Sequence, residues 1–245
     1  MNQHTQVGKT VTTLNLGYAL ALMNKKVTLI DMDPKAQLSQ DCQLDGATVG
    51  INQVLQDEIT LDQAINSLAE NFDVIPVGSG LADYDQVTEN SSRKQQSHKL
   101  KRAIDNMPEQ QDFILIDCPS KPGLLTVNAL LAADEIIVPV KANYLSMQGL
   151  VSVISLFKRL KKISDGAKLW LLLTQMNQAD KLASELKAIV ISYFPQRMLD
   201  TVIRQDDALA ESRTHNKAIF DYHQESHGAA DYFSLAQDII EGRVS

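Results

Sequence analysis

Short runs of apolar residues rich in Val, Ile and Leu recur along the chain and alternate with longer segments of helical spacing. Several of these runs lack polar alternation, which is typical of strands buried on both faces of a parallel sheet. We therefore predict an α/β fold with a doubly wound, mostly parallel sheet and helices on both faces, in a single domain over residues 1–245. The predicted strands cover residues 27–31, 72–76, 113–117, 135–140, 168–174 and 199–203, and the predicted helices cover residues 10–24, 145–163, 179–194 and 229–241.

The composition excludes several classes of protein. Only 2 of the 245 residues are Cys, too few for a disulfide scaffold or a multi-Cys metal site. The formal net charge of −7 excludes a strongly basic nucleic-acid binder, although it leaves room for a local basic patch. No apolar run reaches the length of about 20 residues that spans a bilayer, and residues 1–4 do not open a signal peptide. The sequence therefore predicts a cytoplasmic protein.

A Gly-Lys-Thr triplet at residues 8–10 precedes the first predicted helix. This triplet is the second half of a nucleotide-binding phosphate loop, in which Gly lets the backbone approach a phosphate, Lys neutralises charge and the hydroxyl binds Mg²⁺. N–H groups at the start of a helix also favour an anion. Two predicted strands end in acidic residues, one at Asp31 and Asp33 and the other at Asp117. Because ligands in such folds bind at the carboxyl ends of strands, the sequence predicts a nucleotide site there.

Three segments resemble the motifs of one family. Residues 2–11 (Asn-Gln-His-Thr-Gln-Val-Gly-Lys-Thr-Val) align with NQKGGVGKTT, residues 29–35 align with LIDxDPQ, and residues 116–130 align with IDxPPxxGxLTxNAL. These are motifs of the ParA/MinD group of deviant phosphate-loop ATPases, and the chain resembles its ParA (Soj) branch over nearly its whole length. The resemblance implies a P-loop NTPase fold of the deviant Walker type, ATP and Mg²⁺ as ligands, and a homodimer when ATP is bound.

The resemblance also implies roles for individual residues. Lys9 would contact the β- and γ-phosphates, and Asp33 would orient the attacking water, so these two are the implied catalytic residues. Thr10 and Asp117 would hold Mg²⁺, Asp117 through water. Chemistry of this kind is mostly positioning and charge stabilisation. The implied nucleotide-binding residues are Gln6, Val7, Gly8, Lys9, Thr10 and Val11.

The phosphate loop departs from the family pattern. His4 stands where the family has a Lys that reaches the partner's phosphates, so His4 is the candidate dimer contact. Thr5 and Gln6 replace two glycines, and Val11 replaces a Thr. A non-Gly residue in the left-handed region costs about 1–2 kcal/mol, so we expect these changes to weaken the loop. We also expect the family's first strand to be missing from the chain, because the sequence starts at the loop itself.

The first function that this resemblance implies is that of a ParA-like ATPase with weak ATP hydrolysis. It would act as an ATP-dependent dimerisation switch in the partition or positioning of a plasmid, a chromosome region or other cargo, with a ParB-like or cargo adaptor protein as partner. The second is a pseudo-ATPase of the same fold that binds nucleotide or a partner with little turnover. A metabolic phosphate-loop enzyme is a weaker third alternative, because residues 209–211 also match the ParA family.

Nonspecific DNA binding, which the resemblance implies for the ATP-bound dimer, is expected to be weak. Two Arg positions of the family are Gln205 and Ala208 in this chain. Phosphate contacts supply nearly all nonspecific affinity for DNA. The remaining candidate DNA contacts are Arg204, Arg213 and His227, and an association with the nucleoid would depend on them. No membrane contact is expected, because the last residues are too weakly amphipathic to form a targeting helix.

Overall fold

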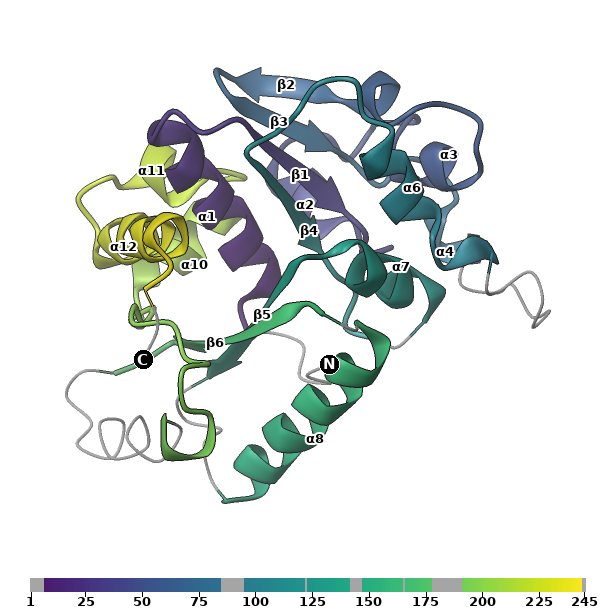
Figure 1. Cartoon of the computed structure of the whole chain (residues 1–245). Helices are drawn as coiled ribbons and strands as arrows, with labels where there is room; N and C mark the ends of the chain where they lie inside the picture. The colour runs from purple at the N-terminus through teal and green to yellow at the C-terminus, as the bar shows by residue number, and fades with distance from the viewer. Residues whose placement is uncertain are drawn as a thin grey trace.

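The computed structural model describes residues 7–84, 95–121, 123–141, 147–164, 166–177 and 191–243. Within these ranges the strands form two sheets (Figure 1). The first sheet contains, in spatial order, β2 (Asn66–Ala69), β3 (Phe72–Ile75), β1 (Val27–Asp31) and β4 (Phe113–Asp117). Strand β1 pairs in parallel with β3 and β4, whereas β2 is antiparallel to β3. The second sheet consists of the parallel strands β5 (Glu135–Lys141) and β6 (Lys168–Thr174).

Helices cover both faces of the first sheet (Figure 1). Helix α1 (Lys9–Leu22) packs on β1, β3 and β4, and α12 (His227–Glu241) packs on α1. Helices α6 (Lys99–Asp105) and α7 (Leu124–Ala132) contact each other on the opposite side. The other helices are α2 (Gln37–Asp41), α3 (Ile51–Leu55), α4 (Leu81–Tyr84), α8 (Met147–Ile163), α10 (Asp207–Thr214), α11 (Ile219–Tyr222) and a 3₁₀ turn at Asp62–Ala64.

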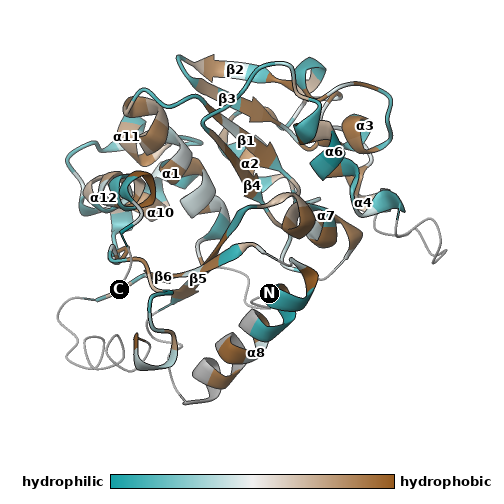
Figure 2. Cartoon of the chain, in the orientation of Figure 1, coloured by the Kyte–Doolittle hydropathy of each residue, from teal (hydrophilic) through white to brown (hydrophobic). Residues whose placement is uncertain are grey.

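Strand β1 lies in the centre of the apolar core, and all five of its residues are buried. Figure 2 shows the same strand as a hydrophobic band between the helices. Side chains alternate across a strand, so Leu29 joins the cluster under α1 and Ile30 joins the cluster on the other face. Gly17 allows α1 to pack directly against β1, because a Cβ at that position would lie 2.5 Å from Leu29 Cδ2.

A cleft of about 500 Å³ lies between β4 and β5 and is lined by both strands, by α1 and by α7. The Phe113 N–H donates to Lys26, and the Asp117 carbonyl accepts from Met32 N–H, so these residues direct their backbone groups toward β1. In a parallel strand the backbone N–H and C=O groups of successive residues point alternately to the two sides of the strand. The backbone groups of Ile114 and Ile116 therefore point away from β1, into the cleft. No strand in the described part of the chain pairs with that edge.

Strand β5 also behaves as the edge of its sheet. The Lys168 N–H donates to the Asp134 carbonyl, which places the even-numbered residues of β5 against β6 and the odd-numbered residues on the cleft side. Pro139 therefore faces the cleft, which it also lines. Proline has no N–H to donate, and it occurs in sheets mainly at edges. The two sheets are thus joined by packing through α1 and α7, without a backbone ladder among the described residues.

The predicted fold class is confirmed, and five of the predicted strands form at or within a residue of the expected limits. The strand predicted at 199–203 is wrong. The Leu199 and Ile203 N–H groups donate to the Leu171 and Leu173 carbonyls of β6, and isolated bridges form at Met198 and Arg204 on either side of the segment. No continuous ladder forms between them, because the Thr201 N–H donates to Asp238 on α12 at 2.8 Å. Most of the helix predicted at 179–194 lies outside the described residues. No helix in the described ranges combines the length and the apolarity needed to cross a membrane.

Candidate functional site

The site begins at the loop that leads into α1. Gly8 adopts φ +91°, in the left-handed region that favours glycine, and its carbonyl accepts from Thr12 N–H at 2.8 Å. Val7 is buried, and its carbonyl accepts from the Thr174 hydroxyl at the carboxyl end of β6. The first turn of α1 carries no acidic residue. The positive end of the helix dipole is therefore available to an anion.

Thr10 and Asp117 meet at the carboxyl end of β4. The Thr10 hydroxyl donates to Asp117 Oδ2 at 2.7 Å, across 107 residues of sequence. Asp117 is 1% exposed, and its other oxygen, Oδ1, is buried with no hydrogen-bond partner among the described residues. Burial and the neighbouring Asp31 carboxylate raise the pKa of Asp117 to about 7. A buried carboxylate oxygen without a donor fits the coordination shell of a hard cation such as Mg²⁺.

Lys9 projects from the first turn of α1 toward the segment that follows β4. Its ammonium group donates to the Ser120 hydroxyl at 2.8 Å. Ser120 was not among the residues predicted from the sequence, because a Ser after a Pro carries no pattern that separates it from an ordinary turn residue. The only sequence signal was its position, three residues beyond Asp117 in the IDxPPxxG-like segment.

Asp31 is the last residue of β1 and Asp33 follows the strand, and the two side chains have different roles. Asp31 is fully buried and accepts from the N–H groups of Asp33 and Ser39 and from the Ser39 hydroxyl. Burial raises its pKa to about 6, although these hydrogen bonds oppose the shift. Asp33 is half-buried, and it accepts from Lys35 N–H at 3.1 Å. Asp31 therefore holds the loop in place, whereas the Asp33 carboxylate remains partly open to a ligand or water.

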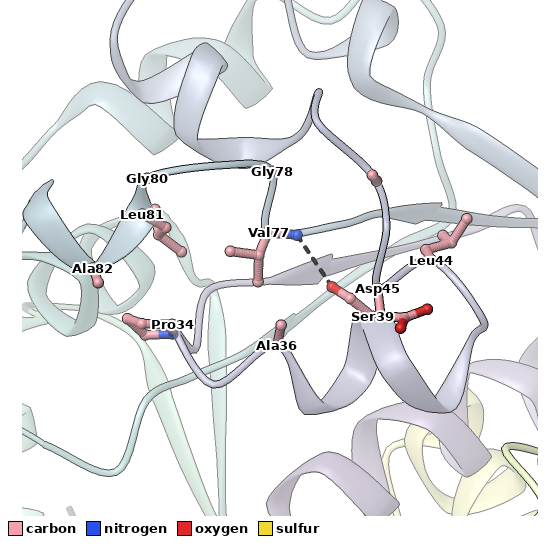
Figure 3. A pocket seen from close by; sticks show the side chains of 11 residues that line it. Pro34, Ala36, Ser39, Leu44, Asp45, Val77, Gly78, Gly80, Leu81 and Ala82 are labelled. Carbon is pink, nitrogen blue, oxygen red and sulfur yellow. Dashed lines mark hydrogen bonds between the residues drawn. The ribbon is translucent and has the colours of Figure 1, made fainter.

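The Ser39 hydroxyl links this network to the end of the neighbouring strand. It accepts from Val77 N–H at 3.1 Å, the bond drawn in Figure 3. Ser39 and Val77 also line a cavity of about 190 Å³, together with Pro34 and the Gly78–Gly80 turn. Lys9, Thr10 and Asp117 do not line this cavity. We therefore assign the Asp31–Ser39–Val77 network to support of the site.

The candidate DNA contacts lie elsewhere: Arg204 and His227 are near the start of α12, and Arg213 is in α10 beside α2. The Arg204 guanidinium pairs with Asp231 at 2.7 Å, and Arg213 pairs with the buried Asp41 at 3.2 Å. His227 is exposed at the first position of α12. A DNA contact by either Arg stays a prediction. To bind a DNA phosphate, Arg204 would have to release Asp231 and Arg213 would have to release Asp41.

The remaining candidates divide between core and undescribed positions. Val11 is partly buried and packs against the core under α1. At this position the family has a Thr, so the chain has an apolar core contact in place of a hydroxyl group. Burial raises the pKa of the Cys118 thiol to about 12, which agrees with a small buried residue and not a nucleophile. His4 and Gln6 lie outside the described residues, so their expected dimer and nucleotide contacts stay predictions.

A helix start, a Lys, a hydroxyl and a buried carboxylate converge at the carboxyl ends of a parallel sheet, which defines a phosphate-loop nucleotide-binding α/β protein. Comparison with known proteins agrees. A family described as "AAA domain" matches residues 1–168. The sporulation initiation inhibitor protein Soj of Bacillus subtilis is 33% identical over 244 residues, which covers 97% of this chain and 95% of that protein.

Two solved structures share the fold. A putative plasmid partition protein from Borrelia burgdorferi, bound to AMPPNP, is 20% identical with a TM-score of 0.83 over 98% of this chain and 96% of its own. The septum site-determining protein MinD from Pyrococcus horikoshii, complexed with Mg-ADP, is 26% identical with a TM-score of 0.74 over 96% and 92%. The chain belongs to the AAA domain family and, within it, to the ParA/Soj branch of the ParA/MinD group.

Proposed function

We propose that the chain binds ATP with Mg²⁺ at the start of α1 and acts as a ParA-like ATPase. The observation that carries the proposal is the contact between Thr10 and Asp117, with Asp117 Oδ1 buried and unpartnered beside it. These two side chains would hold Mg²⁺, which supplies positive charge to the phosphates. The named relatives support the same ligands, since one is described with AMPPNP and one with Mg-ADP.

The chain's own residues would share the remaining work. The Lys9 ammonium would turn from Ser120 to the β- and γ-phosphates, and the N–H groups at the start of α1 would donate to phosphate oxygens. Asp33, half-buried two residues beyond the end of β1, would orient the attacking water. An ATP-bound homodimer with His4 at the interface, and a role in partition with an adaptor protein, complete the proposal and rest on the Soj and ParA relatives.

Replacing Lys9 with Ala should lower the affinity for Mg-ATP by about 100-fold, because a charge-assisted contact to the phosphates is lost. Isothermal titration calorimetry measures this loss directly. Lys26→Ala is the matched control, since Lys26 pairs with Glu109 at the opposite end of β1. Equal affinities for Lys9→Ala and the parent protein would refute the assignment of the phosphate site.

Replacing Asp33 with Ala should leave Mg-ATP bound and reduce its turnover about 100-fold, since Asp33 would position water and not phosphate. Phosphate release and equilibrium binding are measured on the same preparation. A parallel loss of binding and turnover would assign Asp33 to the loop structure or to the cation instead.

The second candidate function is a pseudo-ATPase that binds nucleotide with little turnover. The observation that favours it is the packing of Val11 against the core, where the family has a Thr whose hydroxyl is available to the site. The parent protein decides between the two functions. ATP binding with turnover supports the ATPase, and ATP binding without turnover under the same conditions supports the pseudo-ATPase.

A further inference from the structure

The segment after β4 carries two donors that the family motif lacks. The family has a Pro at the position of Ser120, and a Pro has neither a hydroxyl nor an N–H. Ser120 therefore has a hydroxyl that the family's Pro lacks, on the wall of the site that faces the start of α1. Its hydroxyl oxygen already lies in the site, because it accepts from Lys9 Nζ at 2.8 Å.

The contact with Lys9 fixes where this hydroxyl can act. A phosphate that replaces Ser120 as the partner of Lys9 must come within hydrogen-bond reach of Lys9 Nζ, and Ser120 Oγ is one hydrogen-bond length from the same nitrogen. The Ser120 hydroxyl can then reverse its role and donate to a phosphate oxygen, because a hydroxyl both donates and accepts.

The position of Ser120 also selects among the phosphates. The start of α1 provides its N–H groups on one side of the site, whereas Ser120 belongs to the β4–α7 connection, three residues beyond Asp117. In phosphate loops the backbone N–H groups cradle the α- and β-phosphates, and the Lys reaches the β- and γ-phosphates. Of the two phosphates within reach of the Lys ammonium, the γ-phosphate is the one that the N–H groups leave free for a further donor such as Ser120.

We propose that Ser120 donates to the γ-phosphate and makes the site distinguish ATP from ADP. This inference rests on the proposed function of the site. The connection is also anchored to α7, since the Thr126 hydroxyl donates to the Lys121 carbonyl at 2.9 Å.

The test is calorimetric binding of Mg-ATP and Mg-ADP to the parent protein, Ser120→Ala and Ser120→Thr. Ser120→Ala should weaken ATP binding about tenfold and change ADP binding by less than about twofold, because one hydrogen bond to a charged group is lost. Ser120→Thr keeps the hydroxyl and should restore the preference for ATP. Ser234→Ala removes an exposed hydroxyl from α12 and serves as the control.

The outcomes separate this inference from the proposed function. If the parent protein binds neither nucleotide, the proposed function fails. If the parent protein binds ATP and Ser120→Ala binds it equally well, only the role of Ser120 is overturned. Equal losses of ATP and ADP affinity in Ser120→Ala would likewise overturn it, since they indicate a structural effect. A loss confined to ATP and reversed by Thr supports it.

Discussion

Asp117→Asn should make the nucleotide-free protein more stable at pH 8, by about 3–4 kcal/mol. The folded-state pKa of Asp117 is raised to about 7 by burial and by Asp31, whereas an unfolded Asp titrates near 3.9. The folded state therefore binds the proton more tightly, and the carboxylate destabilises the fold increasingly as the pH rises from about 4 to about 7. Asn keeps the shape of the side chain and removes the ionisation.

Urea denaturation at pH 4 and pH 8 measures this effect, and the advantage of Asp117→Asn should be small at pH 4 and largest at pH 8. The same variant should lose Mg²⁺-dependent nucleotide binding, because the carboxylate that fits the cation is gone. Asp33→Asn is the matched control, since it removes a half-buried carboxylate from the neighbouring strand end. An Asp117→Asn protein no more stable than its parent at pH 8 would contradict the buried, unpartnered state of this group.

Arg204→Ala should lower the free energy of unfolding by about 2–3 kcal/mol, which is large for a residue expected to contact DNA. Three hydrogen bonds join the Arg204 guanidinium to Asp231, whose side chain is only 10% exposed. Removing the Arg leaves a nearly buried carboxylate without its cation, and this unpaired charge causes most of the loss.

A double-mutant cycle checks that cause by urea denaturation. Arg204→Ala with Asp231→Asn should recover part of the lost stability, because the unpaired charge is removed together with its partner. Lys101→Ala is the control, since Lys101 and Asp105 form an exposed pair within α6 and its loss should cost no more than about 0.5 kcal/mol. If Arg204→Ala is as stable as the control, its pairing with Asp231 is not structural.

The sequence was sufficient for the parts of the fold that depend on local pattern. The apolar runs predicted both β1, which is fully buried, and β4, which is partly buried along the cleft. The strand-end rule placed Asp117 at the nucleotide site, where the structure brings it beside Thr10. Strand β2 was not predicted, because Asn66–Ala69 is short, mostly exposed and paired on one side only. Such a strand has no apolar periodicity, and it forms because β3 offers it a free edge.

Contacts between distant segments explain the other differences. The Thr201 N–H donates to the Asp238 carboxylate, and no local pattern around residues 199–203 predicts a hydrogen-bond partner on the last helix. Lys9 and Ser120 are 111 positions apart, so their contact follows from the packing of α1 beside β4. Arg204 was predicted as a DNA contact from its charge and from its place in the segment that resembles the family's DNA-contact surface, and only the fold brings Asp231 to it.

The separation of β4 from β5 has a consequence for how this protein behaves in concentrated solution. Most sheet proteins keep edge strands short, charged or covered, because an open row of N–H and C=O groups can recruit a foreign strand. Here the backbone groups of Ile114 and Ile116 form such a row inside the cleft. The facing strand β5 offers fewer donors, because Pro139 has no N–H. In the described part of the chain the β4 edge is therefore an open edge, and we expect it to take part in self-association of the protein.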